Sequence, residues 1–140
     1  LLGSLSYIFD EEYARLMETI PSDMTSFDKL MYLNKHLFSM IEDRIDIDLL
    51  TRLYSTQLVT KGEKHLLDNK RFYYKLLRKI VAEGQQKNEL TTNMTVNEIV
   101  KLYTISERAL IYDWCLCNGE YSLSSYAKSV MPVFMSVIRL

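Results

Sequence analysis

The sequence predicts an all-α protein, and three observations carry that prediction. Only four Gly and two Pro interrupt its 140 residues. Short alternating runs of β-branched residues, which would indicate strands, are nearly absent. Apolar residues instead recur every three or four positions in six separate stretches, which is the period of an amphipathic helix. With 48% hydrophobic and 25% charged residues, the chain has the composition of a single globular domain over residues 1–140.

Three helices are expected in the first half of the chain. The first covers residues 3–20 and is stopped by Pro21, because proline disrupts a continuing helix. The second begins at the capping sequence Thr25-Ser26-Phe27-Asp28 and runs to about residue 44. A third and weaker apolar pattern covers residues 46–60 and is ended by Gly62.

Three longer patterns follow in the second half. The fourth helix is expected to be capped by Asp68 or Asn69 and to end near Gly84, or one turn beyond it. The fifth opens with the capping box of Thr95 and Glu98 and continues to residues 118–119. The sixth is expected over residues 122–138. It contains Pro132, so a kink or a lost backbone hydrogen bond is predicted near residues 128–132.

The last two predicted helices carry apolar residues on more than one face. One apolar stripe is enough to seat a helix on its own domain, so surplus apolar surface indicates a partner, most simply a second copy of the chain. The sequence therefore predicts a homodimer. The interface residues expected are Ile111, Trp114, Val130, Met131, Phe134 and Met135. Trp114 is equally compatible with a place in the core of its own protomer.

Catalytic and metal-binding patterns are missing from the sequence, which argues against an enzyme and against a bound cofactor. His36 and His65 lie on different elements without neighbouring ligands at metal-site spacing, and no Gly-rich phosphate loop is present. Cys115 and Cys117 are two positions apart on a helix, so they can neither pair nor share a metal. Free thiols are typical of the cytoplasm, and no apolar run is long enough to span a membrane.

Ten tyrosines are a high number for this length, and several fall on or beside inward-facing stripes. These are Tyr13, Tyr54, Tyr73, Tyr103 and Tyr112. A buried tyrosine must place its hydroxyl against a partner, so a cluster of them could line a selective, largely apolar pocket. The alternative is that each hydroxyl reaches the surface or a backbone carbonyl, which leaves the interior fully packed.

Three segments carry a resemblance to a known family. Residues 76–90 (LLRKIVAEGQQKNEL), residues 106–114 (SERALIYDW) and the turn at residues 118–123 (NGEYSL) resemble helix-to-helix passages of tetracycline-repressor-like (TetR) transcription regulators. The first twenty residues resemble the helix that follows the family's DNA-reading unit. Two positions depart from the common pattern, because Asn88 and Ala109 stand where many members have Gly. Asn88 still allows a left-handed helix end.

The resemblance implies the regulatory domain of a bacterial transcription regulator, usually a repressor. The last two helices of such a domain form a four-helix bundle with those of a second subunit. Members contact operator DNA through an N-terminal helix-turn-helix, which nothing in this sequence matches. We therefore expect the chain to be a fragment without that unit and not to bind operator DNA by itself.

The expected ligand is a small, largely apolar effector, held in a cavity bounded by the first, second and fourth helices and the start of the fifth. The lining residues predicted are Phe9, Tyr13, Leu37, Tyr73, Leu76 and Tyr103, with Glu107 as a polar anchor. A competing hypothesis is a helical protein–protein interaction module without a small-molecule pocket.

Overall fold

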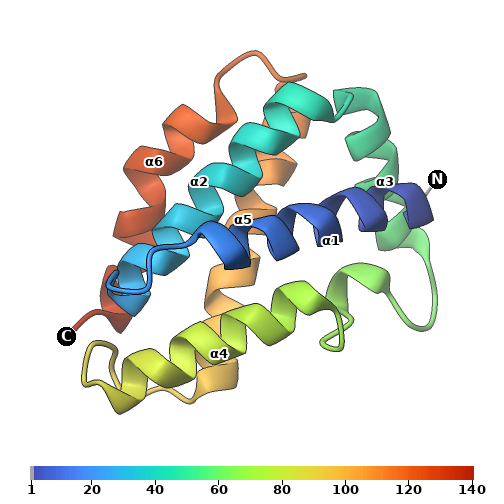
Figure 1. Cartoon of the computed structure of the whole chain (residues 1–140). Helices are drawn as coiled ribbons and strands as arrows, with labels where there is room; N and C mark the ends of the chain where they lie inside the picture. Colours follow the sequence, from blue (N-terminus) through green and yellow to red (C-terminus); the bar gives the residue numbers. More distant parts are fainter. Residues whose placement is uncertain (1) are drawn as a thin grey trace.

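The computed structural model describes residues 2–140, with side chains placed at residue 5 and from residue 7 onward. This part of the chain forms six α-helices and two short 3-10 turns, without a β-strand among them, so the predicted all-α fold is confirmed (Figure 1). The helices are α1 (Leu2–Thr19), α2 (Ser26–Arg44), α3 (Ile47–Val59), α4 (Phe72–Gln86), α5 (Val96–Leu116) and α6 (Leu123–Phe134). The 3-10 turns are η1 (His65–Leu67) and η2 (Ser136–Ile138).

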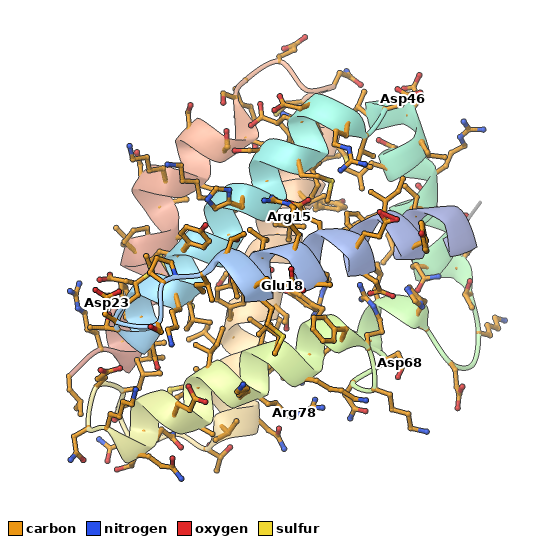
Figure 2. All side chains as sticks on the ribbon, in the orientation of Figure 1. Arg15, Glu18, Asp23, Asp46, Asp68 and Arg78 are labelled. Atoms are coloured by element: carbon orange, nitrogen blue, oxygen red, sulfur yellow. The ribbon has the colours of Figure 1, made fainter. Side chains whose placement is uncertain are left out.

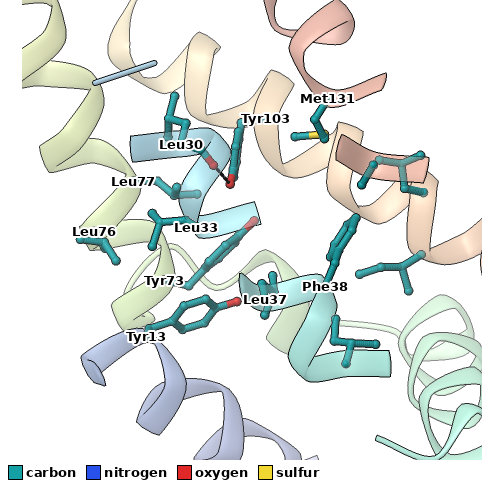
Figure 3. Packing of buried hydrophobic residues seen from close by; sticks show 14 of the residues in the cluster. Tyr13, Leu30, Leu33, Leu37, Phe38, Tyr73, Leu76, Leu77, Tyr103 and Met131 are labelled. Atoms are coloured by element: carbon teal, nitrogen blue, oxygen red, sulfur yellow. Dashed lines mark hydrogen bonds between the residues drawn. The ribbon is translucent and has the colours of Figure 1, made fainter. Parts of the chain in front are cut away.

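The helices surround a single cluster of buried apolar side chains. α5 runs behind α1 and α2 and packs against α3, α4 and α6, while α6 lies alongside α2 (Figure 1). Phe38 of α2, Leu77 of α4 and Met131 of α6 are almost completely buried in this cluster, together with Tyr103 of α5 (Figure 3). Because α5 has neighbours on several sides, it contributes to the core along most of its length.

The polar caps that the sequence predicted for the second and fifth helices are formed. The Thr25 hydroxyl accepts a hydrogen bond from the backbone N–H of Asp28 at 3.2 Å. Thr95 and Glu98 form the complete capping box at the start of α5, with both reciprocal bonds present. Asn88 has φ 58°, so the left-handed helix end expected at this position is confirmed.

Two helix boundaries differ from the prediction. α4 begins at Phe72, and neither Asp68 nor Asn69 caps it, because the Asp68 carboxylate accepts a bond from the N–H of Lys70 in the preceding turn. α6 contains Pro132 but ends at Phe134 rather than near residue 138. The chain beyond it turns back toward the α4–α5 loop, where the Thr91 N–H donates to the carbonyl oxygen of Ile138 at 2.8 Å.

Two buried or half-buried carboxylates tie distant segments to helix N-termini. The Glu89 carboxylate accepts from the N–H of Ser26 at 2.9 Å, and the Glu42 carboxylate accepts from the N–H of Ser124. Each bond satisfies a free N–H in the first turn of a helix. Other charged side chains, such as Arg15 and Glu18 on α1, project from the outer faces of the helices (Figure 2).

At Gly84 the backbone of α4 lies close against neighbouring side chains. A Cβ atom at this position would lie 2.7 Å from both Leu90 Cδ1 and Ser26 Cβ. Gly84→Ala would gain about 1 kcal/mol of helix propensity at an exposed site, but here we expect a net loss of about 1–3 kcal/mol from overpacking. Urea unfolding measures the change, with the exposed Gln86→Ala on the same helix as the control. A stabilised Gly84→Ala variant would contradict the close contact.

Candidate functional site

A buried carboxylate lies at the centre of the helical core. Glu107 of α5 is 2% exposed, and among the described side chains no cation forms an ion pair with it. Its Oε2 atom accepts a hydrogen bond from Asn34 Nδ2 at 2.9 Å, and its Oε1 atom accepts from the Tyr73 hydroxyl. Asn34 is also buried, so α2 and α4 each supply one donor to a carboxyl group that is removed from bulk solvent.

Burial dominates the protonation of this group. Removal from water raises the pKa of the Glu107 carboxyl, and the hydrogen bonds from Asn34 and Tyr73 oppose part of that rise. The pKa of the nearby Tyr13 hydroxyl is also raised, by burial first and by the charge of Glu107 second. The site therefore favours a neutral carboxyl group at pH values where an exposed glutamate is already ionised.

Aromatic rings surround this polar centre. The rings of Tyr13 and Tyr73 lie 5.0 Å apart between α1 and α4, and both residues lie in the core (Figure 3). The ring of Tyr74 meets that of Tyr73 edge to face at 5.1 Å. Tyr103 lies one helical turn before Glu107 on α5, and its hydroxyl donates to the carbonyl oxygen of Leu30 at 2.8 Å (Figure 3). The Tyr103 hydroxyl is also close enough to Glu107 to oppose the rise in the pKa of that carboxyl.

A cavity of about 50 Å³ adjoins Glu107. Residues from five helices, from η1 and from the turn before α4 form its wall. They are Phe9, Tyr13, Leu37, Ile41, Leu50, Leu53, Tyr54, Leu66, Arg71, Tyr73, Glu107, Arg108 and Ile111. This volume holds roughly one or two water molecules, whereas pockets for drug-sized ligands usually enclose about 300–1,000 Å³. The cavity is thus a small, mostly apolar space whose charged lining residues are Glu107, Arg71 and Arg108.

A larger groove lies outside the cavity, between α3, η1 and α5. It encloses about 460 Å³ and is lined by apolar side chains with a few polar ones between them. Its lining residues are Tyr54, Gln57, Leu58, Lys64, Leu66, Leu67, Ile105, Arg108, Ala109 and Tyr112. We call this space the α3–α5 groove. Its volume falls within the range of ligand pockets.

Two exposed apolar stripes run along the last two helices. The α5 stripe consists of Ile105, Ala109, Tyr112 and Leu116, and the α6 stripe of Tyr126, Val130, Val133 and Val137. Each stripe repeats at intervals of four, three and four residues, which places its members on one side of a helix or of its direct continuation. Leu116 and Val133 are 63% and 68% exposed, so this protomer leaves both stripes open to solvent.

The comparisons with known proteins identify the family. A family model described as "YsiA-like protein, C-terminal region", one of the models of TetR C-terminal domains, matches residues 9–137. The chain belongs to the TetR family. No curated protein and no solved structure matches it. Proteins of this family are transcription regulators, and the matched region is their regulatory part.

The described residues of this TetR-family domain show neither a metal-binding cluster nor a membrane-spanning helix. In the part of the chain that the structure describes, no three His, Cys, Asp or Glu side chains gather closely enough to hold a metal ion. No helix over the described residues has the length and hydropathy needed to cross a bilayer. The free Cys115 and Cys117 are both half-buried.

The structure brings five of the predicted pocket residues to one cavity. Phe9, Tyr13, Leu37, Tyr73 and Glu107 all line it. The other two are buried but do not line the cavity: Leu76 lies in the core, and Tyr103 lies beside Glu107 and donates to the backbone of α2. We expected the start of α5 to form part of the wall, but the lining residues come from the middle of α5.

Sequence reasoning missed the contribution of α3 and of the segment before α4. Leu50, Leu53 and Tyr54 come from the weakest apolar pattern in the chain, and Leu66 and Arg71 come from outside the long helices. Of these five residues, only Tyr54 was indicated by the sequence, as one of the tyrosines on or beside an inward-facing stripe. Tyr112, noted in the same way, is 51% exposed and lies on the outer stripe of α5.

Four of the six predicted interface residues are already buried within the protomer. Ile111 is 5% exposed and lines the cavity, and Trp114 lies in the protomer core, where its Nε1–H donates to the Tyr121 carbonyl at 2.8 Å. Met131 and Met135 are 1% and 0% exposed, because this side of α6 faces the core. Val130 and Phe134 retain exposed surface, at or beside the α6 stripe.

Proposed function

We propose that this TetR-family domain senses a small, largely apolar effector at the Glu107 cavity and forms a homodimer through α5 and α6, within a bacterial regulator that is usually a repressor. The observation that supports the sensing proposal is the burial of the Glu107 carboxyl group. A buried carboxyl group without a cationic partner is costly in a core that serves only for packing. At the wall of an apolar cavity it can select a ligand by accepting or donating a hydrogen bond.

The small volume of the cavity defines what the effector must do. At about 50 Å³ the cavity admits no drug-sized molecule without movement of its walls. Phe9 and Tyr13 of α1 form part of that wall. An effector that pushes against this part of the wall would displace α1, the helix that resembles the family's connection to the DNA-reading unit. The effector changes DNA affinity only by the difference between its affinities for the two positions of α1.

The homodimer proposal depends on the two exposed stripes. A twofold axis near α5 and α6 would bring the α5 and α6 stripes of one protomer against those of its partner, in a four-helix bundle. The interface residues we now propose are Ile105, Ala109, Tyr112, Leu116, Tyr126, Val130, Val133, Phe134 and Val137. They replace the buried Ile111, Trp114, Met131 and Met135, which offer a partner little surface.

A thermal-shift screen tests effector sensing. Small aromatic and aliphatic compounds with one polar group should raise the melting temperature by several degrees, because a ligand at 100 times its dissociation constant stabilises by about 2.7 kcal/mol. The shift should shrink in Leu37→Trp, which fills the cavity wall, and persist in the control Val59→Ser, at an exposed position outside both the cavity and the α3–α5 groove.

A second function is favoured by one specific observation, the near-complete filling of the core around Glu107. In this alternative the domain is a helical protein–protein interaction module, and its exposed stripes bind another protein. A screen in which no compound raises the melting temperature, combined with a folded monomer in solution, would favour the interaction module over the sensor.

A further inference from the structure

We propose that Leu66 is a gate between the Glu107 cavity and the α3–α5 groove, and that the effector occupies both spaces when the gate opens. This inference rests on the proposed sensing function and specifies the shape of its site.

The cavity and the groove share part of their walls. Tyr54, Leu66 and Arg108 line both spaces. Tyr54 and Arg108 belong to the long helices α3 and α5, whereas Leu66 belongs to the three-residue turn η1. Since η1 is the shortest and least buried of these elements, displacing the Leu66 side chain is the smallest movement that joins the two spaces.

Polar contacts hold η1 over the cavity. The Tyr74 hydroxyl donates to the Leu66 carbonyl oxygen at 2.7 Å and accepts from Arg108 Nη1 at 3.2 Å. We call these two bonds the Tyr74 latch. The Leu66 N–H donates to Gln57 Oε1 at 3.1 Å on the opposite side. The backbone N–H and the carbonyl oxygen of Leu66 are thus both hydrogen-bonded to side chains. These hydrogen bonds form one discrete arrangement and can break together when η1 moves.

The shapes of the two spaces complement each other. The cavity is too small for a ligand but supplies the acidic wall of Glu107, while the groove encloses about 460 Å³ between mainly apolar walls. A joined site would accept an elongated, largely apolar molecule, with a hydrogen-bonding group at the Glu107 end and its apolar part along Ile105 and Ala109.

The groove also connects the site with the proposed dimer. Ile105, Ala109 and Tyr112 line the groove and belong to the α5 stripe. A ligand in the groove would contact the same side chains as the partner subunit. Ligand and partner would then influence each other directly at α5, in addition to any effect through α1.

Tyr74→Phe tests the gate, because it removes the latch without changing the wall of either space. The probe is 1-aminoanthracene, an apolar fluorophore with one amine group, added to the whole protein in a stopped-flow fluorimeter. Opening is a conformational step before full binding, so loss of the latch should speed association and tighten binding, each by about tenfold. Leu66→Ala should speed association as well. The matched control is Tyr32→Phe, a half-buried tyrosine outside both spaces.

The outcomes separate the gate from the sensing function. A wild-type protein that binds the probe with the same association rate as Tyr74→Phe and Leu66→Ala contradicts the gate and leaves sensing intact. Weaker binding by Tyr74→Phe contradicts the gate too, because it would show that the latch only supports the structure. Absence of probe binding in the wild type and in both variants would contradict sensing and the gate together.

Discussion

Glu107→Ala is expected to lower the free energy of unfolding by about 2–4 kcal/mol. The substitution leaves Asn34 Nδ2 and the Tyr73 hydroxyl without their acceptor in the core, and each buried unsatisfied donor costs about 1–3 kcal/mol. The substitution also removes the cost of burying the carboxyl group. The loss of stability therefore stays below the summed cost of the two unsatisfied donors. Urea unfolding at fixed pH measures the effect.

The pH dependence of the same site provides the sharper test. Burial raises the pKa of Glu107 in the folded protein above its ordinary value of 4.5. The folded state therefore binds the proton more tightly than the unfolded state, and this contribution to stability is complete below pH 4.5. It is lost progressively as the pH rises from 4.5 through the raised pKa. We expect the stability of the wild type relative to Glu107→Gln to fall over that interval.

Glu107→Gln is the matched variant for this measurement, because it keeps the size of the side chain and an acceptor oxygen but does not titrate. Unfolding curves of both proteins between pH 4.5 and pH 8 give the difference directly. If the two proteins lose or gain stability in parallel over that range, Glu107 titrates like an exposed carboxyl, and the physical basis of the proposed site is removed.

Val133→Asp is expected to convert a dimer into a monomer. Val133 is 68% exposed in the protomer and lies in the middle of the α6 stripe, so the substitution should leave the protomer fold intact. In the dimer it would place a carboxylate in a dry interface, where it would face either the same carboxylate of the partner or apolar side chains. Burying an unpaired charge there should weaken dimerisation at least 100-fold.

Sedimentation velocity over a range of protein concentrations measures this effect. The matched control is Val59→Asp, the same substitution at a valine of α3 that is 75% exposed and lies outside both stripes. The control should remain a dimer. A wild-type protein that sediments as a folded monomer at all concentrations would overturn the interface, whatever the variants do.

The candidate site was predictable only in part. Tyr13, Tyr73 and Glu107 could be chosen because each occurs on an inward stripe of a strongly patterned helix. Leu66 could not be chosen, because η1 is a three-residue turn without a periodic pattern. Its place at the cavity is fixed by bonds to Gln57 and Tyr74, which come from two different helices.

The presence and order of the six helices, though not every boundary, could be predicted from the sequence alone. The positions of α2, α5 and α6 follow from apolar periodicity and from the caps at Thr25, Thr95 and Ser122, which act within one turn of the chain. The family, too, was recognisable from local segments. These features are local, so no knowledge of distant neighbours is needed to find them.

Only the tertiary structure decided which apolar face of each terminal helix is buried. α6 turns Leu123, Ala127, Met131 and Met135 toward the core and leaves the α6 stripe outside. Both faces of α6 are apolar, so periodicity alone does not indicate which of them is buried. The choice depends on how α6 lies against α2, a helix about eighty residues earlier in the chain whose packing surface is formed only when the whole protomer has folded.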